Sequence, residues 1–243
     1  MILKRTVLSW ALIVGLTSAG AAVLAQGFGT RADIWAIELG ASVRDLPVRE
    51  FQEYACGSNG GPPRKPIAGF ADYETCAPDG SGHHEVTFRY DDEFEYRARA
   101  IRSERMLGRY EGTTVFGNPV IISVLIDSAG RVAGVRIVSD PRASLVQREK
   151  AYSIRSNLRS RYASQGWDCV DREPSERQRP IGRIFVNQVC TKDLEDRQLF
   201  LEAHYFRKPG QGNTDPATRE LTPGQFESSI RFEMYWTGDD DPG

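Results

Sequence analysis

Potentially reactive side chains are few in this sequence, and the densest group of them is acidic. Asp91, Asp92, Glu93 and Glu95 follow one another almost without interruption. Two carboxylates can share the acid and base roles of a hydrolase, and carboxylate oxygens also bind hard cations. The spacing matches no calcium-binding loop, so an exposed strand or a hairpin turn also accounts for these residues.

A run of arginines follows the acidic group, and it comprises Arg97, Arg99, Arg102, Arg105 and Arg109. Arg97 and Arg99 stand two positions apart, so in a strand they share one face. Guanidinium groups on one face suit phosphate or carboxylate ligands. The candidate ligand contacts are therefore Arg97 and Arg99, together with Asp91 and Asp92. A solvated surface that the preceding acids neutralise is the alternative.

Two other segments have the composition of a ligand site. His83 and His84 lie near Asp79 and Glu85, but adjacent residues of a strand point to opposite faces and do not converge on a metal. The glycine-rich stretch 56–63 could cradle an anion with its backbone amides, yet it lacks the Lys-Ser/Thr ending of a phosphate-binding loop. We predict no metal, no cofactor and no catalytic residue, and we expect a solvated loop and a disulfide-pinned turn.

The first 25 residues have the pattern of a secretory signal. Lys4 and Arg5 supply positive charge, an apolar stretch follows over residues 6–24, and small residues precede Ala25. The pattern predicts cleavage after Ala25 and a periplasmic mature chain. The apolar stretch is nearly long enough to span a bilayer, so retention as an anchor is the alternative, and only retention would fix the protein to a membrane.

Four cysteines suit an oxidising compartment, and they are Cys56, Cys76, Cys169 and Cys190. Four cysteines can pair in three ways. A zinc site is the alternative, but Cys-x-x-Cys pairs are absent and histidine is scarce. We favour the pairs Cys56–Cys76 and Cys169–Cys190, because the two pairs lie in similar surroundings.

That similarity predicts a divergent tandem repeat. Tyr54 and Trp167 each stand two positions before the first cysteine of a pair, and segments 65–68 and 179–182 share a basic-Pro-Ile-small order. Chance is the alternative, because few positions match. The expected organisation is a signal at 1–25, a first unit at 26–139, a second unit at 140–237 and a disordered acidic tail at 238–243.

The elements that must position these residues follow from periodicity. Ala151, Ile154, Leu158 and Tyr162 recur at helical spacing, and residues 140–147 offer helix caps. A shorter helix is expected over residues 42–54, and residues 209–224 read as a long loop because of their prolines and glycines. The expected strands cover residues 85–100, 113–126, 131–138, 184–190, 199–206 and 229–236, with a tight turn at 127–130.

The fold class is therefore α+β, with two related units that each place a helix before antiparallel strands and hold one disulfide. In element order this resembles the small envelope domains of the β-lactamase-inhibitor-protein type and the small lipoprotein of outer-membrane assembly. The resemblance rests on no sequence motif, and it implies a binding or scaffolding role.

The function expected from the sequence is non-catalytic binding in the cell envelope. The formal net charge of −2 argues against a nucleic-acid partner, and the serine nucleophile motif Gly-x-Ser-x-Gly is absent. The partner is an unknown envelope protein or an anionic envelope component. An envelope hydrolase that uses carboxylates of the group Asp91–Glu95 is the alternative.

Overall fold

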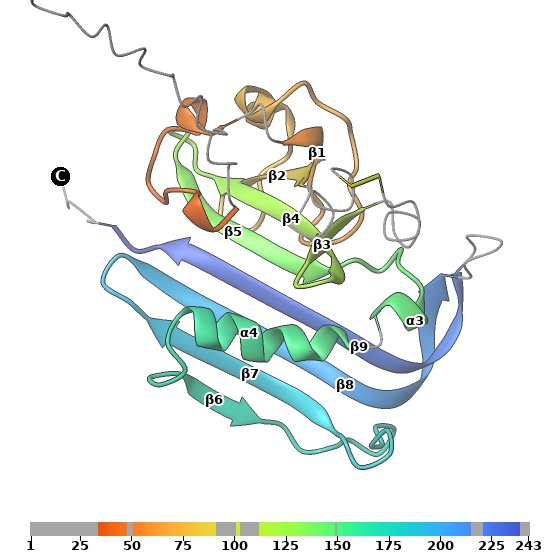
Figure 1. The fold of residues 1–243 in the computed structure, drawn as a ribbon. Helices are drawn as coiled ribbons and strands as arrows, with labels where there is room; N and C mark the ends of the chain where they lie inside the picture. Colours follow the sequence, from red (N-terminus) through yellow and green to blue (C-terminus); the bar gives the residue numbers. More distant parts are fainter. Residues whose placement is uncertain are drawn as a thin grey trace, which may run out of the picture. The chain divides into compact units, whose positions relative to one another are not determined.

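The computed structural model describes residues 34–47, 51–90, 101–102, 112–148, 150–214 and 221–238. These residues belong to one compact unit of the chain and form a single nine-stranded antiparallel sheet (Figure 1). The order of the paired strands is β1-β2-β4-β5-β9-β8-β7-β6, and β3 pairs with β4. The strands are β1 (Gln52–Cys56), β2 (His84–Arg89), β3 (Thr113–Val115), β4 (Asn118–Ile126), β5 (Val132–Ser139), β6 (Asp168–Asp171), β7 (Val186–Asp193), β8 (Arg197–Thr214) and β9 (Leu221–Trp236).

The β4–β5 hairpin forms the middle of the first half of the sheet. Every residue of β4 is buried, as its run of branched apolar side chains requires in a strand that is covered on both sides. The predicted turn is confirmed: the Gly130 amide donates to the Asp127 carbonyl at 3.0 Å, and Gly130 has a φ of +77°. A second turn at Phe116–Gly117 divides the expected strand 113–126 into β3 and β4.

The two halves of the chain meet in the middle of the sheet. β5 pairs with β9 from Gly134–Tyr235 to Val138–Arg231. The predicted boundary between the two units lies at residues 139–140, so this pairing joins a strand before the boundary to a strand after it. The internal duplication and the division into two units stay predictions. What the structure establishes is the coarser class, a mostly antiparallel sheet with few helical residues.

Helical residues concentrate between β5 and β6. They form α3 (Leu145–Arg148), the 3₁₀ turn η5 (Ala151–Ser153) and α4 (Ile154–Arg161). The predicted cap is present: the Ser144 amide donates to Gln147 Oε1 at 2.8 Å, and the Gln147 amide donates to Ser144 Oγ at 3.3 Å. The other 3₁₀ helices in the described ranges are η1 (Ile34–Ala36), η2 (Val43–Asp45) and η4 (Phe70–Thr75).

The helix expected over residues 42–54 is wrong. Where the structure describes this stretch it has only the three residues of η2 and the start of β1. Phe51 packs on Phe70 and Phe88 at ring-centroid distances of 5.9 and 4.4 Å. Contacts with η4 and β2, which are remote in sequence, therefore decide the local conformation against the helical spacing.

The long loop expected over residues 209–224 is also wrong. β8 and β9 remain paired as far as Thr214 and Leu221. A two-stranded ribbon leaves the outward amides of each strand unused, so it tolerates proline. The register shifts between Arg207 and Gln211, and this irregularity takes up Pro209.

One face of the sheet is apolar and holds the core. α4 lies over the second half of this face (Figure 1) and buries Ile154 and Leu158 against it. Lys192 of β7 fixes the end of the helix, because its ammonium group donates to the carbonyls of Tyr162, Ala163 and Gln165 at 2.6, 3.1 and 2.8 Å.

Both predicted disulfides are present. Cys56–Cys76 joins the end of β1 to η4, and Cys169–Cys190 joins directly opposed residues of β6 and β7. Paired cysteines suit an oxidising, exported environment. Among the residues that the structure describes, no helix has the length and apolarity needed to cross a bilayer.

Candidate functional site

The opposite face of the sheet is polar, although much of it is buried. Side chains alternate between the two faces of each strand, and the strand register aligns polar residues of β2, β4, β5 and β9 on this face. We call the aligned set the buried network. Its members are Glu85, Ser123, Arg136, Arg231 and Glu233.

Arg136 is the centre of the buried network, with a residue exposure of 3%. Its Nη1 lies 3.0 Å from Glu85 Oε2, and its Nε donates to Glu233 Oε1 at 2.5 Å. Arg231 Nε donates to the same Glu233 oxygen at 2.9 Å, and the Ser123 hydroxyl donates to Glu85 Oε1 at 2.7 Å. Carboxylates and guanidinium groups thus alternate, which is the arrangement that makes buried ions tolerable.

The buried network controls the protonation of its members. Burial alone would raise the pKa of Glu233, but the hydrogen bond from Arg136 and the charge of Arg231 outweigh burial, and the pKa is lowered. Burial and the charge of Glu233 raise the pKa of Tyr235, whose hydroxyl donates to Glu233 Oε2 at 3.0 Å. Glu233 is therefore ionised and Tyr235 neutral near pH 7, so neither group is poised for proton transfer there.

Glu85 occupies the glycine-rich loop that the sequence marked as a possible anion cradle. The amides of Asn59 and Gly60 donate to the two Glu85 oxygens at 2.5 and 3.1 Å. Arg231 holds the same loop through the Asn59 carbonyl at 3.0 Å and Asn59 Oδ1 at 2.6 Å. These amides do cradle an anion, and the anion is the protein's own carboxylate.

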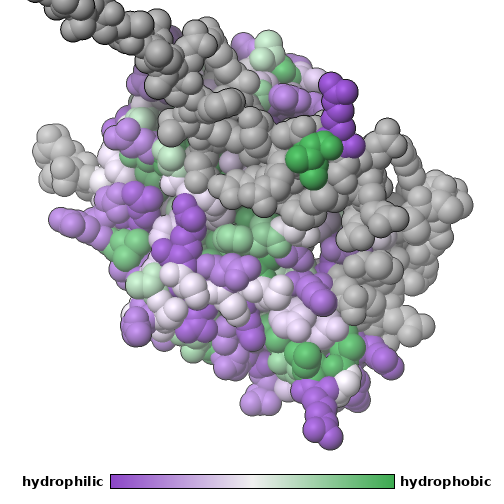
Figure 2. Space-filling view, in the orientation of Figure 1, coloured by the Kyte–Doolittle hydropathy of each residue, from purple (hydrophilic) through white to green (hydrophobic). Residues whose placement is uncertain are grey.

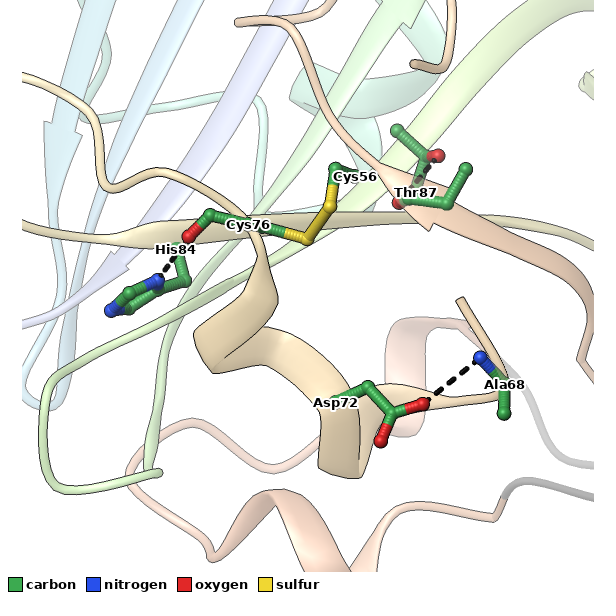
Figure 3. The surroundings of a disulfide bond; sticks show 7 residues. Cys56, Ala68, Asp72, Cys76, His84 and Thr87 are labelled. Carbon is green, nitrogen blue, oxygen red and sulfur yellow. Dashed lines mark hydrogen bonds between the residues drawn. A yellow bond between two sulfur atoms is a disulfide. The ribbon is translucent and has the colours of Figure 1, made fainter. Parts of the chain in front are cut away.

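The first disulfide fixes the base of this loop. Cys56 donates its amide to the Lys65 carbonyl at 2.8 Å and accepts from the Arg64 amide at 2.9 Å, so both ends of the loop are held at one residue. Figure 3 shows Cys76 on the other side of the bond, with its carbonyl 2.6 Å from Nδ1 of His84. The expected disulfide-pinned turn is confirmed.

A second polar group lies further along β8 and β9 on the same face. We call it the open patch, because its residues are only half-buried and the 57–63 loop makes no contact with them. Its four members are Glu202, His204, Glu227 and Ser229. His204 Nε2 is 3.3 Å from Glu202 Oε1, and His204 Nδ1 is 3.5 Å from Glu227 Oε1. Burial opposes ionisation of Glu227, but hydrogen bonds from His204 and Ser229 outweigh it and lower the pKa.

The open patch contains the residue types of a hydrolytic triad. Ser229 Oγ is 3.5 Å from His204 Nδ1, and the other imidazole nitrogen faces Glu202. In a triad the imidazole accepts the serine proton. Here the Ser229 hydroxyl donates to Glu227 at 3.1 Å, and Ser229 lies within β9 rather than on a turn that presents backbone amides to an oxyanion.

The open patch borders the outer edge of the sheet. Val170 of β6 lies opposite Val189 of β7, which lies opposite Glu202 of β8. Val170 is 59% exposed, and Arg172 makes a 3.3 Å ion pair with Glu202. β6 is the last strand in the sheet order, and no described strand pairs with its outer edge. Apolar, basic and acidic groups are thus accessible side by side.

The histidine pair does not converge, as predicted. His84 turns to the Cys76 carbonyl and lies 5.3 Å from the Tyr73 ring, whereas His83 faces Tyr235 with a centroid distance of 6.5 Å. Asp79 accepts from the amides of Ser81 and His83 at 2.9 and 3.1 Å, closing its own turn. Within the described ranges, no three His, Cys, Asp or Glu side chains form a metal cluster.

The remaining predicted ligand contacts lie outside the described residues. They are Asp91, Asp92, Arg97 and Arg99, and the same holds for Glu93, Glu95 and the signal segment. A pocket of about 60 Å³ is lined by residues from both faces of β2 and β4, including Thr87, Phe88, Val120 and Ile121.

The buried network was not predicted from the sequence. Arg136 interrupts the apolar run of β5, and Arg231 and Glu233 alternate with apolar residues in β9. A charge inside an apolar strand is the signal that could have marked a buried ion pair. Glu85 and Glu233 approach Arg136 only after folding, because the partners stand up to 97 positions apart.

Comparison with protein-family models, with curated proteins and with solved structures finds no match to this chain.

Proposed function

We propose that this chain is an exported protein of the cell envelope that acts by binding a partner protein through the open patch. The observation that carries the proposal is the composition of the patch and its border: paired charges, an exposed valine and an outer strand lie together on one sheet face. Protein-binding surfaces combine accessible apolar residues with a polar rim in this way.

The difference between the two ends of the polar face supports this site. At the buried network the loop 57–63 and Arg231 satisfy the charges of the sheet. At the open patch, Glu202 and Glu227 are about a quarter exposed and Arg172 is 55% exposed as a side chain. Charges at such a rim contribute mainly to the choice and orientation of a partner.

The test is site-directed photocrosslinking in the envelope fraction. A photoreactive residue at Val170 should yield a protein adduct, whereas the same residue at the exposed Lys65 should not. The double change Glu202→Lys, Glu227→Lys should abolish the Val170 adduct, because it reverses the charge of the rim. Glu38→Lys, a charge reversal at another exposed residue, should leave it. Equal adducts from Val170 and Lys65 would contradict the proposal.

An envelope hydrolase is the second candidate. The observation in its favour is that the two imidazole nitrogens of His204 lie near Ser229 Oγ and Glu202 Oε1. A serine-directed fluorophosphonate separates the two functions. Labelling that is lost in Ser229→Ala would establish the hydrolase. For the acidic group, the double change Asp91→Asn, Asp92→Asn should leave the adduct at Val170 unchanged if the chain acts by binding.

A further inference from the structure

The segment between β5 and β6 is strongly basic. Residues 141–166 contain six basic residues and one acidic residue, Glu149, in a chain whose net charge is −2. The basic residues are Arg142, Arg148, Lys150, Arg155, Arg159 and Arg161. The excess of positive charge in this segment lies around α4, on the opposite face of the sheet from the open patch.

Several of these charges are directed away from carboxylates. Ile154 and Leu158 are buried under α4, whereas Arg155 and Arg159 are half-buried and one helical turn apart. Arg155 donates to the neutral Gln188 side chain at 3.4 Å, and Arg159 Nε is buried with no hydrogen-bond partner among the described atoms. Of the described ion pairs, none includes Lys150, Arg155 or Arg159.

The exposed surface of α4 suits phosphate groups. Ser156, Asn157 and Ser160 are exposed beside the arginines, and they add small hydrogen-bonding groups to the positive charge. In the space-filling view of this side of the molecule, the region of α4 shows purple and near-white residues beside a green area (Figure 2). A basic helix surface of this kind complements anionic headgroups.

The described chain begins next to this surface. The Arg161 guanidinium lies 4.5 Å from the centroid of the Trp35 ring, and Trp35 also lies 6.5 Å from Phe232 on the apolar face. Trp35 thus adds an aromatic ring next to the positive charge at the end of α4.

We infer that the basic surface formed by Lys150, Arg155, Arg159 and Arg161 docks on a bilayer that contains anionic phospholipid. Docking would place α4 against the headgroups and leave the polar face of the sheet directed away from them. The attraction is electrostatic and is therefore weakened by salt. Each basic side chain near an anionic surface increases partition about five-fold.

Vesicle cosedimentation tests the inference. Every described strand, α4 and both disulfides lie within residues 34–238, so the chain starting at Gln26 retains the described fold. It should sediment with vesicles that contain about 30% phosphatidylglycerol, and should not sediment with pure phosphatidylcholine or at about 0.5 M salt. Arg155→Gln, Arg159→Gln should lower binding at least about ten-fold.

The matched control is Arg64→Gln, Lys65→Gln, which removes the same charge from two exposed residues of the 57–65 loop region. It should bind as the parent chain does. Equal loss in both pairs, equal binding to both lipids, or a preference for a soluble polyanion over anionic vesicles would overturn the inference. Unchanged circular dichroism of each variant excludes unfolding. The photocrosslink at Val170 should survive Arg155→Gln, Arg159→Gln, so this result is separable from the proposed partner site.

Discussion

At the scale of single residues, Arg136 is the centre of the buried network. It is a cation within a strand of branched apolar residues, and it is compensated by Glu85 and Glu233 from two other strands. Glu85 in turn holds the amides of the 57–63 loop. One guanidinium group therefore connects the middle of the sheet with the loop that covers it.

Replacing this charge should be costly. Arg136→Met keeps an unbranched apolar stem but leaves two buried carboxylates without their central partner, and it should lower the free energy of unfolding by about 3–5 kcal/mol. Arg172→Met, at a largely exposed ion pair, should cost under about 1 kcal/mol. Urea unfolding measures both. A loss for Arg136→Met no larger than that for Arg172→Met would show that the buried network is not a coupled unit.

The lowered pKa of Glu233 predicts how the stability of the protein depends on pH. Its pKa in the folded protein lies below the ordinary 4.5, so the unfolded chain binds the proton more readily. The stabilisation is complete above about pH 5.5 and is lost as the pH falls through the lower folded pKa. Glu233→Gln should therefore be less stable at neutral pH and lose less stability on acidification, as urea midpoints at several pH values would show. An unchanged pH dependence in Glu233→Gln would contradict this prediction.

At the scale of elements, α4 depends on a residue from the sheet. The end of a helix leaves backbone carbonyl groups without partners in the helix. Lys192 of β7 donates to the carbonyls of Tyr162, Ala163 and Gln165, which follow the last residue of α4. The cross-strand disulfide Cys169–Cys190 lies two residues away on the same strand. The helix that carries the basic surface is therefore positioned by β7.

Lys192→Met should loosen this end of α4. The substitution retains the apolar stem but removes charge-assisted hydrogen bonds that together contribute about 2 kcal/mol. We expect that loss in urea unfolding, and faster amide exchange at Leu158 to Tyr162. Lys150→Met, at an exposed lysine before the helix, should leave both quantities unchanged. Unaltered exchange at Leu158 in Lys192→Met would show that the cap is not needed.

At the scale of the whole molecule, the pairing of β5 with β9 determines how the chain is organised. A fragment of residues 26–139 contains β1 to β5 and the first disulfide, but it leaves the β9-facing edge of β5 unpaired and Arg136 without Glu233. We expect this fragment not to fold cooperatively, as judged by the dispersion of its amide resonances. A folded fragment would favour two independent units instead.

Features that depend on neighbours in the chain could be predicted from the sequence. The two disulfides, the turn at 127–130 and the capped helix segment after β5 were predicted, because cysteine surroundings, turn residues and helical periodicity are local signals. The secondary structure of residues 42–54 and 209–224 depends on tertiary contacts instead. Phe51 joins rings from η4 and β2, and a ribbon partner keeps residues 207–214 extended despite Pro209.

The same division applies to the candidate site. A sequence lists charges but not their partners, and His204, Glu202 and Glu227 meet only because β8 and β9 pair in one register. The sequence indicated that the glycine-rich loop could bind an anion. The carboxylate that it binds, Glu85, belongs to β2 and is brought to the loop only by folding. Local chemistry is specified residue by residue, but which charges neutralise each other is decided by strand pairing, since partners distant in sequence meet only in the folded sheet.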